Sequence, residues 1–112
     1  MWIWRKLNLT DTQKQDLKQY RTNNKAVFRS ALASYLAARQ ALLTAIQNNA
    51  ETQSPASQLA TAEANLMALR VKREQYIASI LVGDQVTTWQ NYLAERTARM
   101  QERINKLNQA NP

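Results

Sequence analysis

"LTDTQKQDLKQY" runs from Leu9 to Tyr20, and "LVGDQVTTWQNY", from Leu81 to Tyr92, repeats its pattern. The two segments share Leu at the first position, Gln at the fifth, an apolar residue at the ninth and Tyr at the twelfth. In each copy the leading Leu stands where the chain turns into a helix, so it can anchor the incoming chain beneath that helix. We interpret the repeat as two helix entrances fixed in the same way.

The first copy predicts the start of a long helix. Thr10 and Gln13 form the Thr-x-x-Gln pattern of a capping box, in which each side chain bonds to the backbone N–H of the other residue. Asp11 suits the positive end of the helix. Neither Gly nor Pro occurs from Thr10 to Asn49, and an unbroken helix of about 38 residues would measure about 57 Å. This length predicts an elongated molecule; a kink near Asn23–Asn24 is the alternative to a straight helix.

The rest of the chain also has the character of helices joined by short turns. The polar segment 47–57 predicts a turn, with Ser54 as a cap and Pro55 as the first residue of a helix that runs to about Leu81. Gly83, the single glycine, separates that helix from a last one. We predict an all-α chain with an aromatic and basic arm over 1–8, one helical domain over 9–107 and a frayed tail over 108–112.

Composition excludes several classes of function. The 112 residues carry a net charge of +7 and contain neither Cys nor His. Disulfides, thiol catalysis, zinc fingers and the usual Ser-His-Asp triad are therefore excluded. We find no catalytic constellation, and we expect no enzyme activity, no cofactor and no metal site. No apolar run approaches the roughly 18 residues of a membrane span. The N-terminal segment lacks the apolar region of a secretory signal, so we expect either a cytosolic protein or a mature exported one.

The paired motifs resemble those of a known family. Leu9, Thr10 and Gln13 form an LTxxQ motif, and Leu81 with Gln85 forms a degenerate second copy. Paired LTxxQ motifs that bracket a helical domain resemble the Spy/CpxP family of bacterial periplasmic proteins, over roughly residues 5–105. The resemblance implies a long helical hairpin that dimerises antiparallel into a curved cradle. It also implies a periplasmic location, with the signal peptide removed, and ATP-independent chaperoning of unfolded or partly folded clients on the concave face.

Members of the CpxP type imply an alternative function. They bind a sensor kinase and damp envelope-stress signalling, so the runner-up is a regulatory domain that binds the periplasmic part of a sensor kinase. The metal-binding members coordinate through His, which this chain lacks. The second motif has Val82 where the family has Thr, so one hydroxyl cap is missing; Gly83 or Asp84 could substitute for it.

One face of the first long helix carries the candidate client-binding surface. Residues 1–50 hold eight basic and two acidic side chains, whereas residues 51–112 hold seven and six. At about 100° per residue, the cations of the first helix fall on one strip that continues into leucines. The strip consists of Lys14, Lys18, Arg21, Lys25, Arg29, Leu32, Leu36, Arg39 and Leu43.

Beside the strip lies a predicted core seam, with Leu17, Phe28, Tyr35 and Leu42. Phe28 and Trp89 complete the predicted client-binding set, although Trp89, as the counterpart of Leu17, is more simply a core residue. The strip itself has four interpretations. It is a solvated basic face, a client surface that attracts acidic segments and offers weak apolar contact, a nucleic-acid surface, or a membrane surface. We disfavour nucleic acid because no stacking pattern or known motif accompanies the charge, and we expect no stable membrane insertion.

Overall fold

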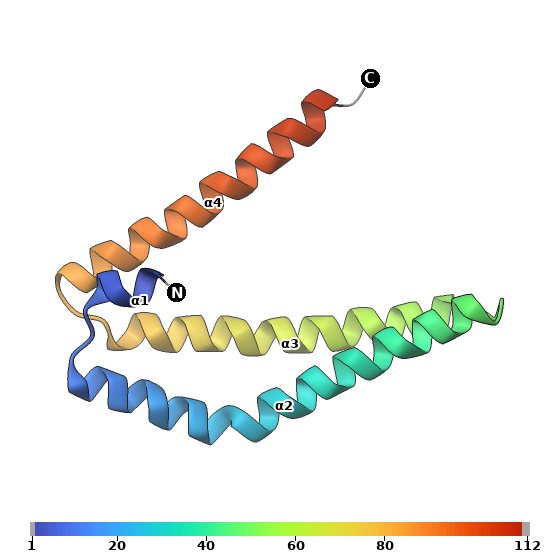
Figure 1. Ribbon diagram of the computed structural model, residues 1–112, viewed down its shortest axis with the longest axis horizontal. Helices are drawn as coiled ribbons and strands as arrows, with labels where there is room; N and C mark the ends of the chain where they lie inside the picture. The colour runs from blue at the N-terminus through green and yellow to red at the C-terminus, as the bar shows by residue number, and fades with distance from the viewer. Residues whose placement is uncertain (1, 111–112) are drawn as a thin grey trace. The chain divides into compact units, whose positions relative to one another are not determined.

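The computed structural model describes residues 2–110 and is helical throughout, with short connections (Figure 1). The helices are α1 (Trp2–Leu7), α2 (Asp11–Gln47), α3 (Gln53–Ile80) and α4 (Asp84–Ala110). No strand occurs among the described residues. The predicted all-α class is therefore confirmed. The last helix continues to Ala110, beyond the predicted start of the tail at residue 108, and residues 111–112 lie outside the described part.

The long helix α2 begins and ends with defined caps. At its start the Thr10 N–H donates to Gln13 Oε1 at 2.9 Å, and the Gln13 N–H donates to Thr10 Oγ1 at 3.1 Å. These two bonds confirm the predicted capping box. At its end Asn49 adopts a φ of 51°, and the Ala50 N–H donates to the Ala45 carbonyl at 2.8 Å. This is a Schellman-type ending with Asn in the position that Gly usually takes.

The start of α3 differs from the prediction of a Ser54 cap. The helix begins at Gln53, and the carbonyl of Thr52 already accepts the Ala56 N–H at 3.0 Å. The cap comes from the Glu51 carboxylate, which accepts the Ser54 N–H at 2.8 Å. A carboxylate also suits the positive end of the helix dipole. Pro55 falls within the first turn, where its missing N–H costs nothing.

Packing contacts group the chain into two compact units, and we describe each by itself. Unit 1 comprises residues 1–14 and 78–112, and unit 2 comprises residues 15–77. In unit 1 the short helix α1 packs on α4. The core of unit 1 consists of Ile3, Leu7, Leu81 and Trp89. The N-terminal segment is thus a docked helical arm over its described residues, and Asn8, with a φ of 49°, ends it.

Unit 2 consists of the greater part of α2 beside α3. The rings of Tyr20 and Tyr76 stack with centroids 4.3 Å apart, and the Tyr76 hydroxyl donates to the Asp16 carbonyl at 3.3 Å. Its buried apolar side chains are Ala45, Leu66 and Ile77. The predicted seam residues Leu17, Phe28, Tyr35 and Leu42 are half-buried.

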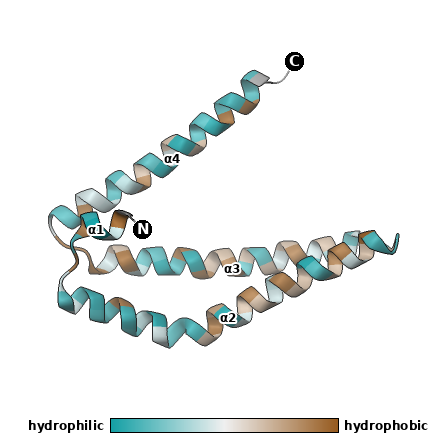
Figure 2. Cartoon of the chain, viewed as in Figure 1, coloured by the Kyte–Doolittle hydropathy of each residue, from teal (hydrophilic) through white to brown (hydrophobic). Residues whose placement is uncertain are grey.

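Helix α2 bends about midway, where it stands away from α3 before approaching it again toward the turn (Figure 1). Asn24 Nδ2 donates to the Tyr20 carbonyl at 2.8 Å, one turn earlier in the helix. A side-chain donor that engages a carbonyl of the helical ladder is a recognised cause of bending. The bend lies near the predicted Asn23–Asn24 site, and it separates a largely hydrophilic first part of α2 from a more hydrophobic second part (Figure 2).

Candidate functional site

The two motif copies meet in unit 1 through their glutamines. Gln13 Nε2 donates to Gln85 Oε1 at 2.7 Å, and Gln85 Nε2 donates back to Gln13 Oε1 at 2.8 Å. Gln13 is only 6% exposed. The two side chains therefore form a closed amide pair, which we call the glutamine clasp, between residues 72 positions apart in the sequence.

Each glutamine of the clasp makes an equivalent pair of further bonds, and Gln85 Nε2 makes one more, to the Asn8 carbonyl at 3.5 Å. Gln13 Oε1 accepts the Thr10 N–H, and Gln85 Oε1 accepts the Val82 N–H at 3.1 Å. Gln13 Nε2 donates to the Ile80 carbonyl at 2.9 Å, and Gln85 Nε2 donates to the Leu7 carbonyl at 3.1 Å. Each amide thus caps its own helix and also binds the carbonyl end of the helix that precedes the other copy. This accounts for the repeat. In each copy the Gln follows the leading Leu by four positions, and this spacing brings the two amides into contact.

The second copy manages without the hydroxyl that Val82 lacks. The Gln85 N–H donates to the Val82 carbonyl at 3.1 Å, in the place of a bond to a threonine hydroxyl. The tight turn requires Gly83 at a φ of 56°, a conformation that residues with a Cβ adopt at a cost. Gly83 therefore contributes to the substitute for the lost cap. Of the leading leucines, Leu81 is buried and Leu9 is half-buried, in keeping with an anchoring role.

The predicted basic and apolar strip lies on the exposed face of α2. All of its cations are exposed, from Lys14 to Arg39. Its leucines are exposed as well: Leu32 by 36%, Leu36 by 52% and Leu43 by 62%. The helical spacing therefore predicted a real surface, with charge toward the N-terminal half of α2 and apolar groups toward the C-terminal half. Phe28, at its edge, is half-buried.

Trp89 does not belong to that surface. It is 4% exposed in the core of unit 1, and its ring lies 5.4 Å from that of Tyr92. Its assignment to the client-binding set is wrong for this structure, and its interpretation as a core residue is confirmed. The physical reason is the docked arm: Ile3 and Leu7 of α1 are buried in the same small core, which gives the indole an apolar environment.

Unit 2 contains a basic cavity that the sequence analysis did not identify. It has a volume of about 390 Å³ and lies between α2, in the region of its bend, and α3. Its walls combine cations with apolar and aromatic side chains: Tyr20, Arg21, Asn24, Lys25, Val27, Phe28, Arg29, Leu69, Lys72 and Arg73. The Arg73 guanidinium lies 5.9 Å from the centroid of the Phe28 ring, a cation–π distance. The cavity thus joins the edge of the strip to two cations of α3.

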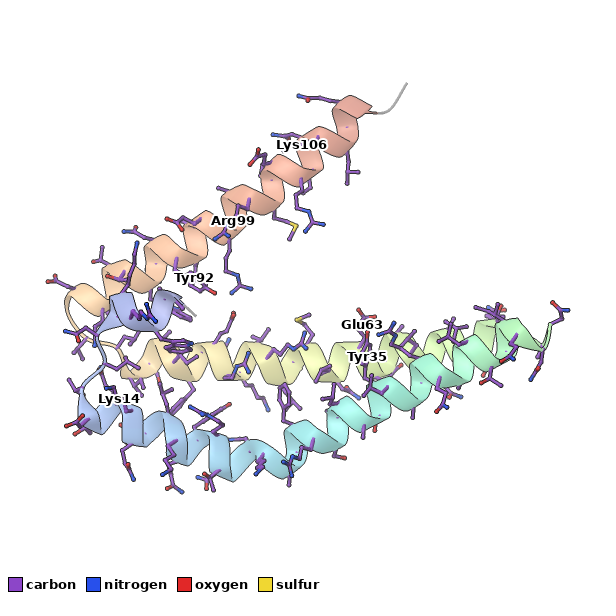
Figure 3. The ribbon with its side chains drawn as sticks, in the orientation of Figure 1. Lys14, Tyr35, Glu63, Tyr92, Arg99 and Lys106 are labelled. Carbon is purple, nitrogen blue, oxygen red and sulfur yellow. The ribbon has the colours of Figure 1, made fainter. Side chains whose placement is uncertain are left out.

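No acidic side chain lines this basic cavity. Opposite charges do pair on α4, where Arg99 pairs with Glu95 at 4.0 Å and Lys106 with Glu102 at 3.4 Å; Figure 3 labels Arg99 and Lys106. Both are exposed i,i+4 pairs, which contribute only about 0.3–0.5 kcal/mol each. The positive charge of the cavity is therefore not neutralised by the residues that form it.

The cations of α2 and those of α3 were both visible in the sequence, but their meeting at one cavity was not predicted. The segment Arg70–Arg73 holds three cations in four residues, which is a visible signal of local charge. Nothing in the periodicity of α3 says that Lys72 and Arg73 come beside Arg21, Lys25 and Arg29. That juxtaposition depends on how α3 lies against α2.

Comparisons with known proteins identify no relative. No family model, no curated protein and no solved structure matches the chain. Within residues 2–110, no cluster of three acidic side chains is placed to hold a metal ion. Over the same residues, no helix is both long enough and apolar enough to cross a membrane.

Proposed function

We propose that this chain is an ATP-independent periplasmic chaperone of the Spy/CpxP type, which binds unfolded or partly folded proteins on α2. The observation that carries the proposal is the strip, where exposed cations and exposed leucines share one helix face. Cations attract acidic segments over long distances, and the leucines with the stems of Lys and Arg then provide weak apolar contact. Weak contact of this kind allows a client to fold while it is bound.

The glutamine clasp supports the family assignment within this proposal. A five-residue motif alone is a weak signal, but here both copies use their Gln in the same way, and the two side chains bind each other. The motif therefore has a structural purpose that two unrelated helix starts would not share. The assignment implies that α2 and α3 act as an elongated hairpin and that two copies form an antiparallel cradle.

The exposed apolar side chains of α4 support the proposed homodimer. Val86, Met100, Ile104 and Leu107 are between 43% and 73% exposed, and the last three are spaced by four and three residues. Such a row forms a stripe on one helix face, which a second copy could cover. A chain of this length gains stability from such an interface, because a small domain buries a modest share of its surface.

The experiment that tests the proposal is suppression of aggregation of a chemically unfolded protein, without nucleotide, at low and physiological salt. We expect suppression by the wild-type chain that weakens as salt rises. The double variant Lys18→Glu and Lys25→Glu should lose most of the activity, because it reverses charge in the middle of the basic part of the strip. Arg70→Glu with Arg103→Glu is the matched control, since it makes the same change in net charge at exposed positions outside the strip.

Helicity by circular dichroism and mass by sedimentation show whether both double variants keep the wild-type structure and oligomeric state. An equal loss of activity in the two double variants would mean that only the net charge of the protein matters, and it would contradict a role for the strip. No suppression at either salt by a folded wild-type chain would refute the chaperone proposal. The regulatory alternative, a domain that binds one sensor-kinase partner, would then be the better account.

A further inference from the structure

We propose that the basic cavity of unit 2 binds an anionic amphiphile, specifically a phosphate monoester joined to a short alkyl chain. The cavity combines a cationic wall with an apolar and aromatic wall, and such a ligand has the matching two parts. Its volume of about 390 Å³ falls within the range of roughly 300–1,000 Å³ that is typical of small-molecule sites.

The head group is inferred from the cations. Arg21, Lys25 and Arg29 are spaced by four residues along α2, and like charges at this spacing repel one another. Lys72 and Arg73 add two more positive charges from α3, and no carboxylate lines the cavity. A dianionic phosphate relieves this repulsion, and guanidinium groups bind it through paired N–H donors. A carboxylate carries only one negative charge and would relieve less of it.

The tail is inferred from the apolar wall. Phe28, Leu69 and Tyr20 are half-buried in the cavity, and Val27 is 54% exposed. Inorganic phosphate would leave these side chains in contact with water, whereas an alkyl chain would cover them. Burial of apolar surface is favourable in proportion to its area, so the tail adds affinity that the head group alone lacks.

This inference does not depend on client capture. It shares Arg21, Lys25 and Arg29 with the strip. It also needs side chains outside the strip, namely Tyr20, Leu69, Lys72 and Arg73, and the volume between α2 and α3. A protein could bind the amphiphile and fail to suppress aggregation, or the reverse. The two proposals therefore fail separately.

The test is isothermal titration of the full chain with monodecyl phosphate below its critical micelle concentration, with amide chemical shifts to locate the ligand. We expect saturable binding at one ligand per chain, with shifts concentrated in 20–29 and 69–73. Inorganic phosphate tests the head alone, decyl maltoside tests the tail alone, and decanoate tests the choice of head group. Each should bind at least about tenfold more weakly, because inorganic phosphate lacks the tail, decyl maltoside lacks the charge, and decanoate carries one negative charge in place of two.

Variants assign the site. Arg73→Gln should weaken binding of monodecyl phosphate about fivefold, and Arg73→Gln with Lys25→Gln about 25-fold, as expected for exposed charge pairs. Arg103→Gln with Lys106→Gln, which removes the same charge from α4, should leave binding unchanged. An equal loss in this control, shifts outside the two segments, or decanoate binding as tight as the phosphate would each overturn the proposal.

Vesicles separate the two sources of such a ligand. If vesicles that contain phosphatidic acid bind the chain and free monodecyl phosphate does not, and Arg73→Gln weakens vesicle binding, the cavity takes its phosphate from a bilayer surface. If free ligand binds at one per chain, the cavity takes a dispersed amphiphile. Binding of neither would overturn the inference.

Discussion

Replacement of Gln13 by Ala should destabilise unit 1 more than replacement of any other polar residue of α2. The side chain accepts the Thr10 N–H and a Gln85 N–H, and it donates to the Ile80 carbonyl and to Gln85 Oε1. Each bond contributes about 0.5–1.5 kcal/mol net, and a partner left unsatisfied costs about as much. Water can reach some of the freed groups, and Ala favours the helix by a few tenths of a kcal/mol. We therefore expect a loss of about 2–3 kcal/mol.

The assay is urea unfolding followed by tryptophan fluorescence and by circular dichroism. Trp2, Trp4 and Trp89 all belong to unit 1, so fluorescence reports that unit, whereas circular dichroism reports the helices of both. Protein concentration is held fixed, because a dimer would make the midpoint depend on it. Gln101→Ala is the control: Gln101 Nε2 donates to Asn105 Oδ1 at 3.0 Å in an exposed pair, and its loss should cost no more than about 0.5 kcal/mol.

The double variant separates a clasp from two independent caps. If Gln13 and Gln85 act as one closed pair, the loss in Gln13→Ala with Gln85→Ala should be smaller than the sum of the single losses by about 1–2 kcal/mol. Additive losses would mean that each glutamine caps its own helix and gains nothing from the other. A Gln13→Ala variant as stable as Gln101→Ala would refute the reasoning altogether.

Three further substitutions test the described geometry by urea unfolding. Thr10→Ala removes one cap acceptor and should cost about 1 kcal/mol, and no loss would contradict the capping box. Gly83→Ala should cost about 1 kcal/mol through its φ of 56° alone, because a Cβ there would meet no atom within 4 Å; a neutral result would mean that the turn relaxes. Trp89→Ala should cost about 3–5 kcal/mol by opening a cavity in the core of unit 1, and a loss under 1 kcal/mol would contradict its burial.

Local features were predictable from the sequence because they depend on neighbouring residues. The capping box at Thr10 needs only residues three positions apart, and the exposed strip on α2 follows from the angle between successive side chains. The cap of α3 shows the limit of such local predictions. The sequence predicted Ser54 as the cap, but the Glu51 carboxylate takes that role, because several polar residues of this turn can accept the bond.

Tertiary features were not predictable in the same way. The repeat indicated two similar helix entrances, but not that Gln13 and Gln85 bond to each other, since nothing local fixes a contact between segments so far apart. The basic cavity likewise needs the position of Lys72 and Arg73 beside Arg21, which depends on the packing of α3 against a bent α2. Burial of Trp89 depends on the docking of α1. That helix has only six residues, too few for a hydrophobic pattern that predicts where it packs.

The glutamine clasp also sets the order in which the chain can fold. To bring Gln13 and Gln85 together, an open chain must close a loop of 72 residues, at an entropic cost of about 4 kcal/mol. Unit 2 is inserted within that loop, and its own ends are joined by the bond from the Tyr76 hydroxyl to the Asp16 carbonyl. Once unit 2 has formed, most of the loop is already closed. The arrangement therefore favours a route in which unit 2 folds first and the later pairing of Gln13 with Gln85 then closes only a short remaining loop.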